Sequence, residues 1–131
     1  MRFYNDSKAT TPEAAITALN AFPIGTVHAI AGGSDKKVDL SGFASELKAR
    51  AKAVYLIGAT AGKIRELLGS GGPEVVDAGT LEAAVREAAS RAKAGEVVLL
   101  SPACASYAQF KNYEERGEGF RKAVGANEGP Q

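Results

Sequence analysis

The sequence predicts an α/β domain of three αβα layers, in which a Rossmann-like, mostly parallel sheet of five to six strands has helices on both faces. Two observations lead to this fold class. Short apolar segments alternate along the whole chain with longer segments whose apolar residues recur every three or four positions, the pattern of strands alternating with helices. Crossovers between parallel strands are right-handed almost without exception, so the helices should cover both faces of the sheet.

Five apolar segments are expected to form the strands of this sheet. They are residues 3–5, 26–31, 53–57, 75–77 and 97–100. The first of them starts close to Met1 and runs directly into a polar motif. This abrupt start suggests a domain cut from a longer chain.

Helix starts are marked by hydroxyl side chains that can accept a hydrogen bond from the first turn. The residues expected to cap four helices in this way are Thr11, Ser41, Thr60 and Thr80. Pro12 strengthens the first assignment, because proline suits the first helical position. A fifth, charged helix is expected from about Tyr113, and residues 125–131 are expected to be a flexible tail after a domain spanning 1–124.

Composition narrows the classes of function. The chain has 131 residues, 45% hydrophobic and 24% charged, with a net charge of +1, which are ordinary values for one globular domain. The near-zero charge argues against a nucleic-acid partner. One cysteine excludes an internal disulfide, and no apolar run approaches the length of a membrane span. The expected protein is a cytoplasmic monomer without a membrane or nucleic-acid partner.

Polar or glycine-rich motifs follow most of the predicted strands. Residues 5–10 follow the first strand, residues 32–36 the second, residues 58–60 the third and residues 101–107 the last. In a parallel sheet the carboxyl ends of all strands lie at one edge, where ligands bind. The motifs are therefore expected to form one site, and small side chains with hydroxyls, as in residues 101–107, could hold a carboxylate.

Other candidate motifs have simpler structural interpretations. Residues 58–63 resemble a phosphate-binding loop but have three residues between the glycines instead of four. Cys104 is expected to be a packed side chain, since the single histidine, His28, lies in the second strand and is expected to pack or meet solvent. One cysteine and one histidine also leave no zinc site. Arg116, which follows two glutamates, is expected on a solvated helix face.

Three motifs in order resemble those of the Mur ligases, in their C-terminal domain. They are Asn-Asp-Ser-Lys-Ala-Thr at residues 5–10, Gly-Gly-Ser-Asp-Lys at 32–36, and Ser-Pro-Ala-Cys-Ala-Ser with Gln-Phe-Lys-Asn-Tyr-Glu-Glu-Arg-Gly within 101–117. The resemblance is strongest to members that add D-glutamate to UDP-N-acetylmuramoyl-L-alanine, using ATP and Mg²⁺ and an acyl-phosphate intermediate in peptidoglycan synthesis. It implies a sixth, antiparallel strand. It also implies that the UDP-binding and central ATPase domains lie outside this chain. Without those domains, this chain should be inactive and should bind no cofactor tightly.

The resemblance also implies roles for single residues. Asp6 would contact the ribose of the nucleotide, and Lys8 would face its phosphates and the acyl phosphate, as the catalytic residue.

D-glutamate would be held by residues from three of the motifs. Thr10 and Lys36 would bind one carboxylate, whereas Ser106 and the neighbourhood of Tyr113 would bind the other. Tyr107 is also expected to belong to the D-glutamate site. The family commonly has phenylalanine at the position of Tyr113, acting through its backbone. No metal ligand is expected in this domain.

Two alternatives remain open on the sequence. The chain could be a stand-alone small-molecule binding module without a catalytic partner. It could also be the corresponding domain of another Mur or folylpolyglutamate-type ligase, although the Asp-Asn-Pro-Arg motif of the diaminopimelate-adding relative does not occur.

Overall fold

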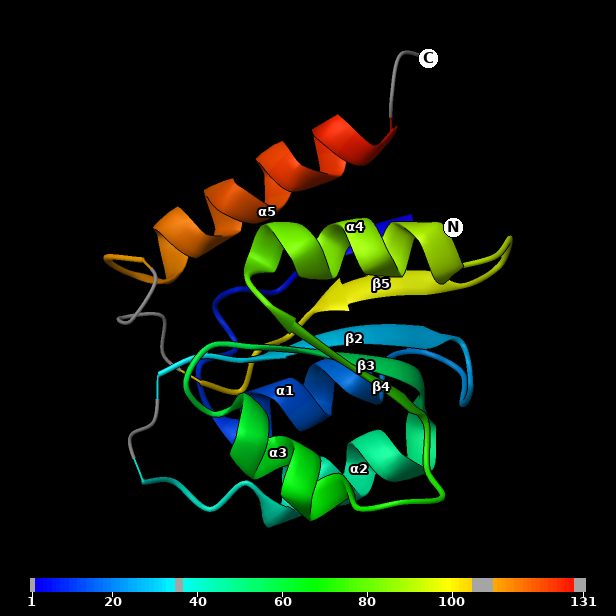
Figure 1. Cartoon of the computed structure of the whole chain (residues 1–131), viewed down its shortest axis with the longest axis vertical. Helices are drawn as coiled ribbons and strands as arrows, with labels where there is room; N and C mark the ends of the chain where they lie inside the picture. The colour runs from blue at the N-terminus through cyan, green and yellow to red at the C-terminus, as the bar shows by residue number, and fades with distance from the viewer. Residues whose placement is uncertain (1, 35–36, 105–109, 129–131) are drawn as a thin grey trace.

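A computed structural model describes residues 2–34, 37–104 and 110–128 of the chain. Within these residues the sheet has five strands in the order β1-β5-β2-β3-β4, and every neighbouring pair is parallel (Figure 1). The strands are β1 (Arg2–Asn5), β2 (Val27–Gly32), β3 (Ala51–Ile57), β4 (Glu74–Gly79) and β5 (Val97–Leu100). The helices are α1 (Pro12–Leu19), α2 (Ser41–Arg50), α3 (Ala61–Leu68), α4 (Leu81–Arg91) and α5 (Tyr113–Glu128). The predicted α/β class and parallel sheet are confirmed, and no sixth strand occurs in the part described.

The helices lie on both faces of the sheet, as expected. α1, α2 and α3 cover one face, and α4 and α5 cover the other (Figure 1). β3 shows the alternation that this requires, because Val54 and Leu56 join the core under α1–α3 whereas Tyr55 and Ile57 join the core under α4 and α5. All four side chains are at most 1% exposed. A strand buried on both faces is typical of the middle of a parallel sheet.

Two of the four predicted helix caps are confirmed. Thr11 Oγ1 accepts a hydrogen bond from Ala14 N at 3.3 Å, and Thr80 Oγ1 accepts one from Ala83 N at 3.2 Å. Each side chain thereby satisfies one of the amide groups that the first helical turn leaves unpaired.

The other two predicted caps are wrong, for different reasons. Ser41 is the first helical residue after Leu40, and its hydroxyl donates instead to Asp39 Oδ1 at 2.6 Å. Hydrogen bonds from the hydroxyl and the amide of Ser41 lower the pKa of Asp39. Thr60 has a helical backbone and makes no cap bond. Its hydroxyl is used by a neighbouring loop, where Oγ1 accepts from Gly33 N at 3.0 Å.

α5 is longer than the sequence suggested. The helix continues to Glu128, so residues 125–128, the first part of the segment expected to be a tail, are helical. Gly117 and Gly119 do not interrupt it. α5 carries several charged residues, and no helix in the described part of the chain is long and apolar enough to cross a membrane.

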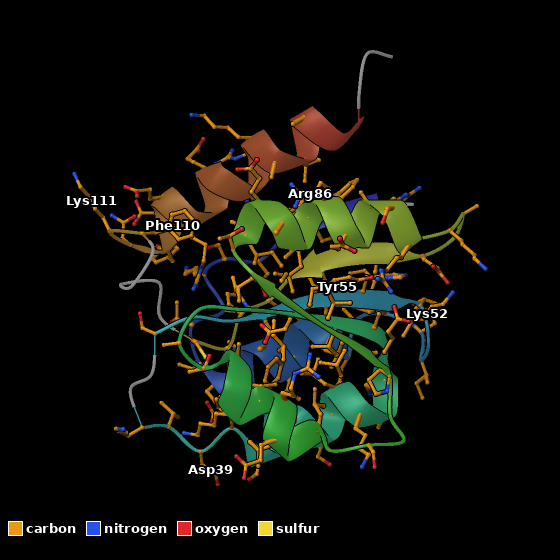
Figure 2. All side chains as sticks on the ribbon, in the orientation of Figure 1. Asp39, Lys52, Tyr55, Arg86, Phe110 and Lys111 are labelled. Carbon is orange, nitrogen blue, oxygen red and sulfur yellow. The ribbon has the colours of Figure 1, made fainter. Side chains whose placement is uncertain are left out.

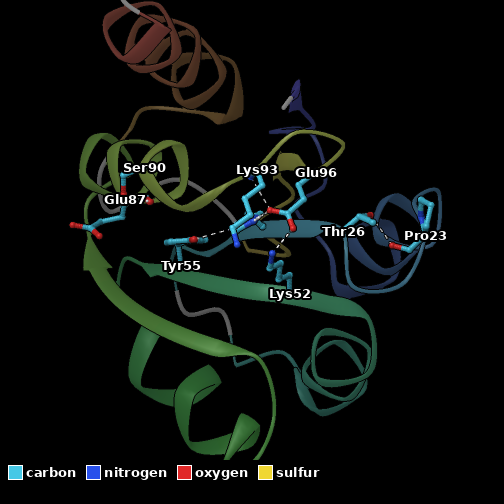
Figure 3. A network of polar contacts seen from close by, with 9 residues as sticks. Pro23, Thr26, Lys52, Tyr55, Glu87, Ser90, Lys93 and Glu96 are labelled. Atoms are coloured by element: carbon cyan, nitrogen blue, oxygen red, sulfur yellow. Dashed lines mark hydrogen bonds and ion pairs between the residues drawn. The ribbon is translucent and has the colours of Figure 1, made fainter.

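A polar cluster at the amino edge of the sheet links β2, β3 and the turn before β5, with His28 and Tyr55 buried and Lys52 and Lys93 exposed (Figure 3). His28, 1% exposed, has Nδ1 at 2.9 Å from the Tyr55 hydroxyl and Nε2 at 2.9 Å from Glu96 Oε1. Lys52 pairs with the other oxygen of Glu96, and Lys93 N donates to Oε1 at 2.8 Å. Lys52 above all, together with His28 and Lys93, lowers the pKa of Glu96 to about 2. His28 is therefore a packed strand residue, far in the fold from the carboxyl edge.

Candidate functional site at the carboxyl edge

The loops after β1 and β5 lie side by side at the carboxyl edge of the sheet. The pairing of β1 with β5 is continued beyond the strands, where Asp6 N donates to Leu100 O at 2.8 Å. Farther along, Ala103 N donates to Ala9 O at 2.9 Å. Ala103 has a φ of 64°, which a residue with a side chain adopts only at some cost. The first and last of the predicted motifs are thus in direct contact through their backbones.

The loops after β2 and β3 join the same edge. Gly32 N donates to Pro102 O at 2.9 Å, and Thr60 N donates to Gly33 O at 3.1 Å. Gly58 must be glycine here, because its φ is 72° and a Cβ atom would lie 2.7 Å from Gly33 Cα. Gly58 therefore allows the loops after β2 and β3 to approach closely, and the expected structural role of residues 58–63 fits the observed contacts.

Arg116 connects the loops after β1 and β5 to helix α5. Its guanidinium donates from Nε to Ser7 Oγ at 3.0 Å, from Nη2 to Ser7 O at 2.8 Å, and from Nη1 to Cys104 O at 2.9 Å. The side chain is 1% exposed, and burial lowers its pKa to about 10. The prediction of a solvated Arg116 is wrong: this arginine is the largest fully buried side chain described.

The start of α5 packs tightly on the loop after β1. Asn5 Nδ2 donates to Gly117 O at 3.0 Å, and Ser7 Oγ donates to Tyr113 O at 2.6 Å. A Cβ atom at Gly117 would lie 3.3 Å from Asn5 Nδ2 and 3.5 Å from Ser7 Cβ. The Arg-Gly pair that ends the third motif therefore serves packing, with the arginine inserted between the loops and the glycine allowing the helix to approach them.

Four of the predicted site residues lie in the described part of the chain. Asp6 and Thr10 are half-buried and Lys8 is exposed in the loop after β1. Burial raises the pKa of Asp6. Tyr113, 37% exposed, begins α5 and contacts this loop through its backbone carbonyl. The fold therefore brings these four residues to the same edge of the sheet.

Three predicted site residues, Lys36, Ser106 and Tyr107, lie outside the described residues. Their flanks are placed at the same edge: Ser34 follows β2, and Cys104 belongs to the loop after β5. The assignment of these three residues to D-glutamate stays a prediction.

Cys104 is a packed residue of this loop. Its side chain is 5% exposed, and its Sγ lies 3.4 Å from Thr60 Oγ1. His28 belongs to the polar cluster at the opposite edge of the sheet, so no histidine is placed to activate the thiol. The geometry fits the packing role expected of Cys104.

Ser7 and Arg116 hold the loops after β1 and β5 together, and neither was predicted to do so from the sequence. Ser7 is 4% exposed and makes hydrogen bonds through its amide, its carbonyl and its hydroxyl. Both residues lie within the motifs that pointed to this site, so their importance could have been suspected. Neither the residue types nor their spacing in the sequence indicates that an arginine on a helix contacts a loop 109 positions earlier.

The chemistry available at this edge is that of a binding site for anions. An exposed lysine, a half-buried threonine and a half-buried carboxylate lie on one loop, next to a second loop of small residues. Cations and hydroxyl donors suit phosphates and carboxylates, whereas a carboxylate accepts from hydroxyls of a sugar. No group of three or more His, Cys, Asp or Glu side chains that could hold a metal ion occurs among the residues described.

The chain matches a protein-family model and is similar to curated proteins. The family model described as "Mur ligase, glutamate ligase domain" matches residues 1–104. UDP-N-acetylmuramoylalanine–D-glutamate ligase of Solibacter usitatus is 52% identical over 93% of this chain and 27% of its own length. The enzyme of the same name from Ralstonia nicotianae is 49% identical over 96% of this chain and 25% of its own length. The chain thus spans about a quarter of the length of these relatives.

Solved structures share the fold at low sequence identity. MurF ligase from Thermotoga maritima, in complex with ADP, matches with a TM-score of 0.56 and 22% identity over 95% of this chain and 27% of its own. UDP-N-acetylmuramate–alanine ligase MurC from the same organism matches with a TM-score of 0.52 and 18% identity over 88% of this chain and 25% of its own. These two structures support the fold alone. The family model and the two curated relatives show that the chain belongs to the glutamate ligase domain family of the Mur ligases.

Proposed function

We propose that this chain is the C-terminal, amino-acid-binding domain of a ligase that joins D-glutamate to UDP-N-acetylmuramoyl-L-alanine at the expense of ATP. Relatives that carry this activity in their names are about half identical to the chain over more than nine-tenths of its length. UDP-sugar and ATPase domains, in this proposal, belong to the rest of a longer protein. The isolated chain then holds substrates but completes no reaction.

The main support for the proposal is that the loops after β1 and β5, which carry two of the motifs, are bonded together at the carboxyl edge. Arg116 bonds to Ser7 and to Cys104, and so fixes the loop that carries Asp6 and Lys8 against the loop that leads to Ser106. Pre-organised donors stabilise a charged reactant without reorganisation at the moment of reaction. A rigid edge of this kind suits a domain that must present several donors to one small dianion.

The nucleotide side of the proposal rests on the loop after β1. Asp6 accepts hydrogen bonds from the ribose hydroxyls, and Lys8 faces the phosphates and the acyl phosphate that ATP forms with the acceptor's carboxylate. The exposure of Lys8 leaves its ammonium group available to a ligand. We propose no Mg²⁺ ligand in this domain.

The D-glutamate side uses Thr10 and Lys36 for one carboxylate and Ser106, Tyr107 and the backbone near Tyr113 for the other. These contacts leave the amine of D-glutamate free to attack the acyl phosphate. Its nitrogen forms the new amide bond to the acyl carbon, while inorganic phosphate leaves with the electrons of the broken carbon–oxygen bond.

The test is made in a full-length ligase that carries this domain. Hydrogen bonds to charged groups contribute about 1.5–3 kcal/mol, or roughly ten- to a hundredfold in affinity. Lys36→Met and Ser106→Ala should each raise the KM for D-glutamate by that factor and leave the KM for ATP nearly unchanged. An increase in the KM for ATP instead would contradict the assignment of these residues to the amino acid.

Lys37→Met is the matched control, because Lys37 is the adjacent lysine and is exposed. It should change neither constant. If Lys37→Met is damaging and Lys36→Met is silent, the loop is aligned with the family one position away from its true register.

A further inference from the structure

A hollow lies between α4 and α5. It has a volume of about 800 Å³, within the range of small-molecule sites. Figure 2 shows two of its lining residues, Arg86 on α4 and Phe110 just before α5. The proposed roles of the carboxyl-edge loops do not use this hollow.

Apolar side chains line much of the hollow. Leu81 comes from the start of α4, Ala123 and Ala126 come from α5, and the ring of Phe110 closes one side. Leu81 is 3% exposed and Ala123 is 6% exposed, so these two are fixed in the core of the domain. The shape is therefore set by packed groups, and an apolar ligand body would be buried against them.

Gly119 makes room for the aromatic wall. A Cβ atom at this position would lie 3.2 Å from Phe110 Cε1 and 3.6 Å from Leu81 Cδ2. An added Cβ would press on the Phe110 ring, so the absence of a side chain at Gly119 allows this ring to pack closely against α5 as one wall of the hollow. The hollow thus depends on a residue that costs helix stability.

Two cations stand at the hollow, Arg86 from α4 and Lys122 from α5. Both are exposed, and neither forms an ion pair with a carboxylate in the part of the chain described. One carboxylate, Glu82, also lines the hollow. Two cations against one carboxylate, above an apolar floor with an aromatic ring, favour a ligand that combines a flat apolar body with an anionic group.

We propose that the α4–α5 hollow, defined by Leu81, Arg86, Phe110, Lys122 and Ala126, is a binding site for amphipathic organic anions. The ligand class is an aromatic or fused-ring body bearing one carboxylate, sulfonate or phosphate. The ring lies on Leu81 and Phe110, and the anion lies between the two cations. This site is independent of the D-glutamate and nucleotide assignments above.

The experiment is a titration of the ¹⁵N-labelled chain with anilinonaphthalene sulfonate, an aromatic anion of this class, followed by two-dimensional amide NMR. The expected result is saturable binding, with the largest shifts at amides of Thr80–Glu82 and 119–126. Shifts confined to the loops after β1 and β5, or no saturation, would overturn the proposal. The same titration with naphthalene, which lacks the anion, should give weaker binding.

Variants locate the site and separate its two contributions. Ala126→Trp fills the hollow from the exposed side of α5 and should weaken binding more than tenfold, whereas Ala126→Ser should not. Arg86→Gln and Lys122→Gln should each weaken binding by about two- to fivefold, the range of exposed charge pairs. Arg65→Gln, an exposed arginine on α3 at the opposite face, is the charge-matched control and should leave binding unchanged.

Each outcome decides the matter. Thermal melts establish whether each variant folds. If Ala126→Trp does not fold, the affinities of Arg86→Gln, Lys122→Gln and the double variant test the proposal. Equal affinity in the parent, Arg86→Gln and Lys122→Gln would overturn the anion assignment. Full protection of 119–126 from the probe in a full-length ligase would show that this face is covered by protein instead.

Discussion

Arg116 donates a hydrogen bond from Nη2 to the carbonyl oxygen of Ser7 at 2.8 Å, across 109 positions of the chain. Through this contact the last helix controls the shape of the first loop. The same guanidinium reaches Cys104 O at 2.9 Å, so the relative position of the two motif loops depends on one side chain. A buried guanidinium that donates to a backbone carbonyl in each of two loops fixes the position of one loop relative to the other.

Replacing Arg116 by methionine should destabilise this chain. The substitution removes the free-energy cost of burying a cation, but it also removes three hydrogen bonds, to Ser7 Oγ, Ser7 O and Cys104 O. Loss of a partner by a buried polar group costs about 1–3 kcal/mol. We expect a net decrease of about 1–3 kcal/mol in the free energy of unfolding, measured by urea titration. Arg121→Met on the same helix, where the side chain is 66% exposed, should change it by less than about 0.5 kcal/mol. Equal midpoints for the two variants would contradict the connecting role of Arg116.

Two glycines of α5 should respond oppositely to alanine. At Gly125 nothing lies within 4 Å of an added Cβ, so Gly125→Ala should gain up to about 1 kcal/mol in helix propensity. At Gly117 the added atom would lie 3.3 Å from Asn5 Nδ2, and hydrogen bonds to Gly117 O and Ser7 N hold that amide in place. Gly117→Ala should therefore lower the melting temperature and Gly125→Ala should raise it. A higher melting temperature in both variants would show that the Asn5 side chain yields.

The Glu96 cluster should make stability sensitive to acid. The pKa of Glu96 is lowered from 4.5 to about 2 in the folded chain, chiefly by Lys52. The ionised carboxylate thus contributes stability above pH 4.5, and this contribution is lost as the pH falls from 4.5 toward 2. The difference in melting temperature between the parent and Glu96→Gln should be largest near neutral pH and should shrink across this window.

Glu66→Gln is the control for the acid prediction. Glu66 is an exposed glutamate on α3, and the structure gives it no ion pair or hydrogen bond within the described residues. Its melting temperatures should run parallel to those of the parent from neutral pH to pH 2. A constant offset for Glu96→Gln over the same range would mean that the carboxylate contributes only as a polar group.

Cys104 should be dispensable for chemistry. Its thiol is buried against Thr60, and its interaction with Arg116 uses the backbone carbonyl, which alanine retains. In a full-length ligase, Cys104→Ala should keep turnover within a few-fold of the parent, measured by phosphate release. A loss of several orders of magnitude at unchanged melting temperature would instead give the thiol a direct role.

The fold class could be predicted from the sequence because it depends on local patterns. Apolar segments, prolines and glycines predicted all five strands and five helices close to their observed places. Caps were predictable only where no other group competed for the hydroxyl. Thr80 has no such neighbour and caps α4, whereas Thr60 is drawn to the amide of Gly33 in another loop.

The location of the candidate site could be predicted from the sequence, but the buried contacts that hold its loops together could not. Parallel strands bring their motifs to one edge whatever the strand order, so the location followed from topology. The burial of Arg116 did not, because an arginine after two glutamates on a helix has the pattern of a solvated surface. Its burial depends on the order of the strands, which places β1 beside β5 and thus beside α5. Strand order is a property of contacts between distant segments, and no local pattern records it.

The placement of β1 beside β5 sets the order in which this domain can be completed on the ribosome. At about 5–20 residues per second, Arg116 is synthesised roughly 5–20 s after Ser7. For most of that interval β1 lacks its neighbour β5, and for all of it the loop after β1 lacks its buried donor. A nascent chain that ends at residue 104 already contains the whole segment that matches the family model, yet its carboxyl edge is unfinished. The edge that we propose binds substrate is thus the last part of the domain to form.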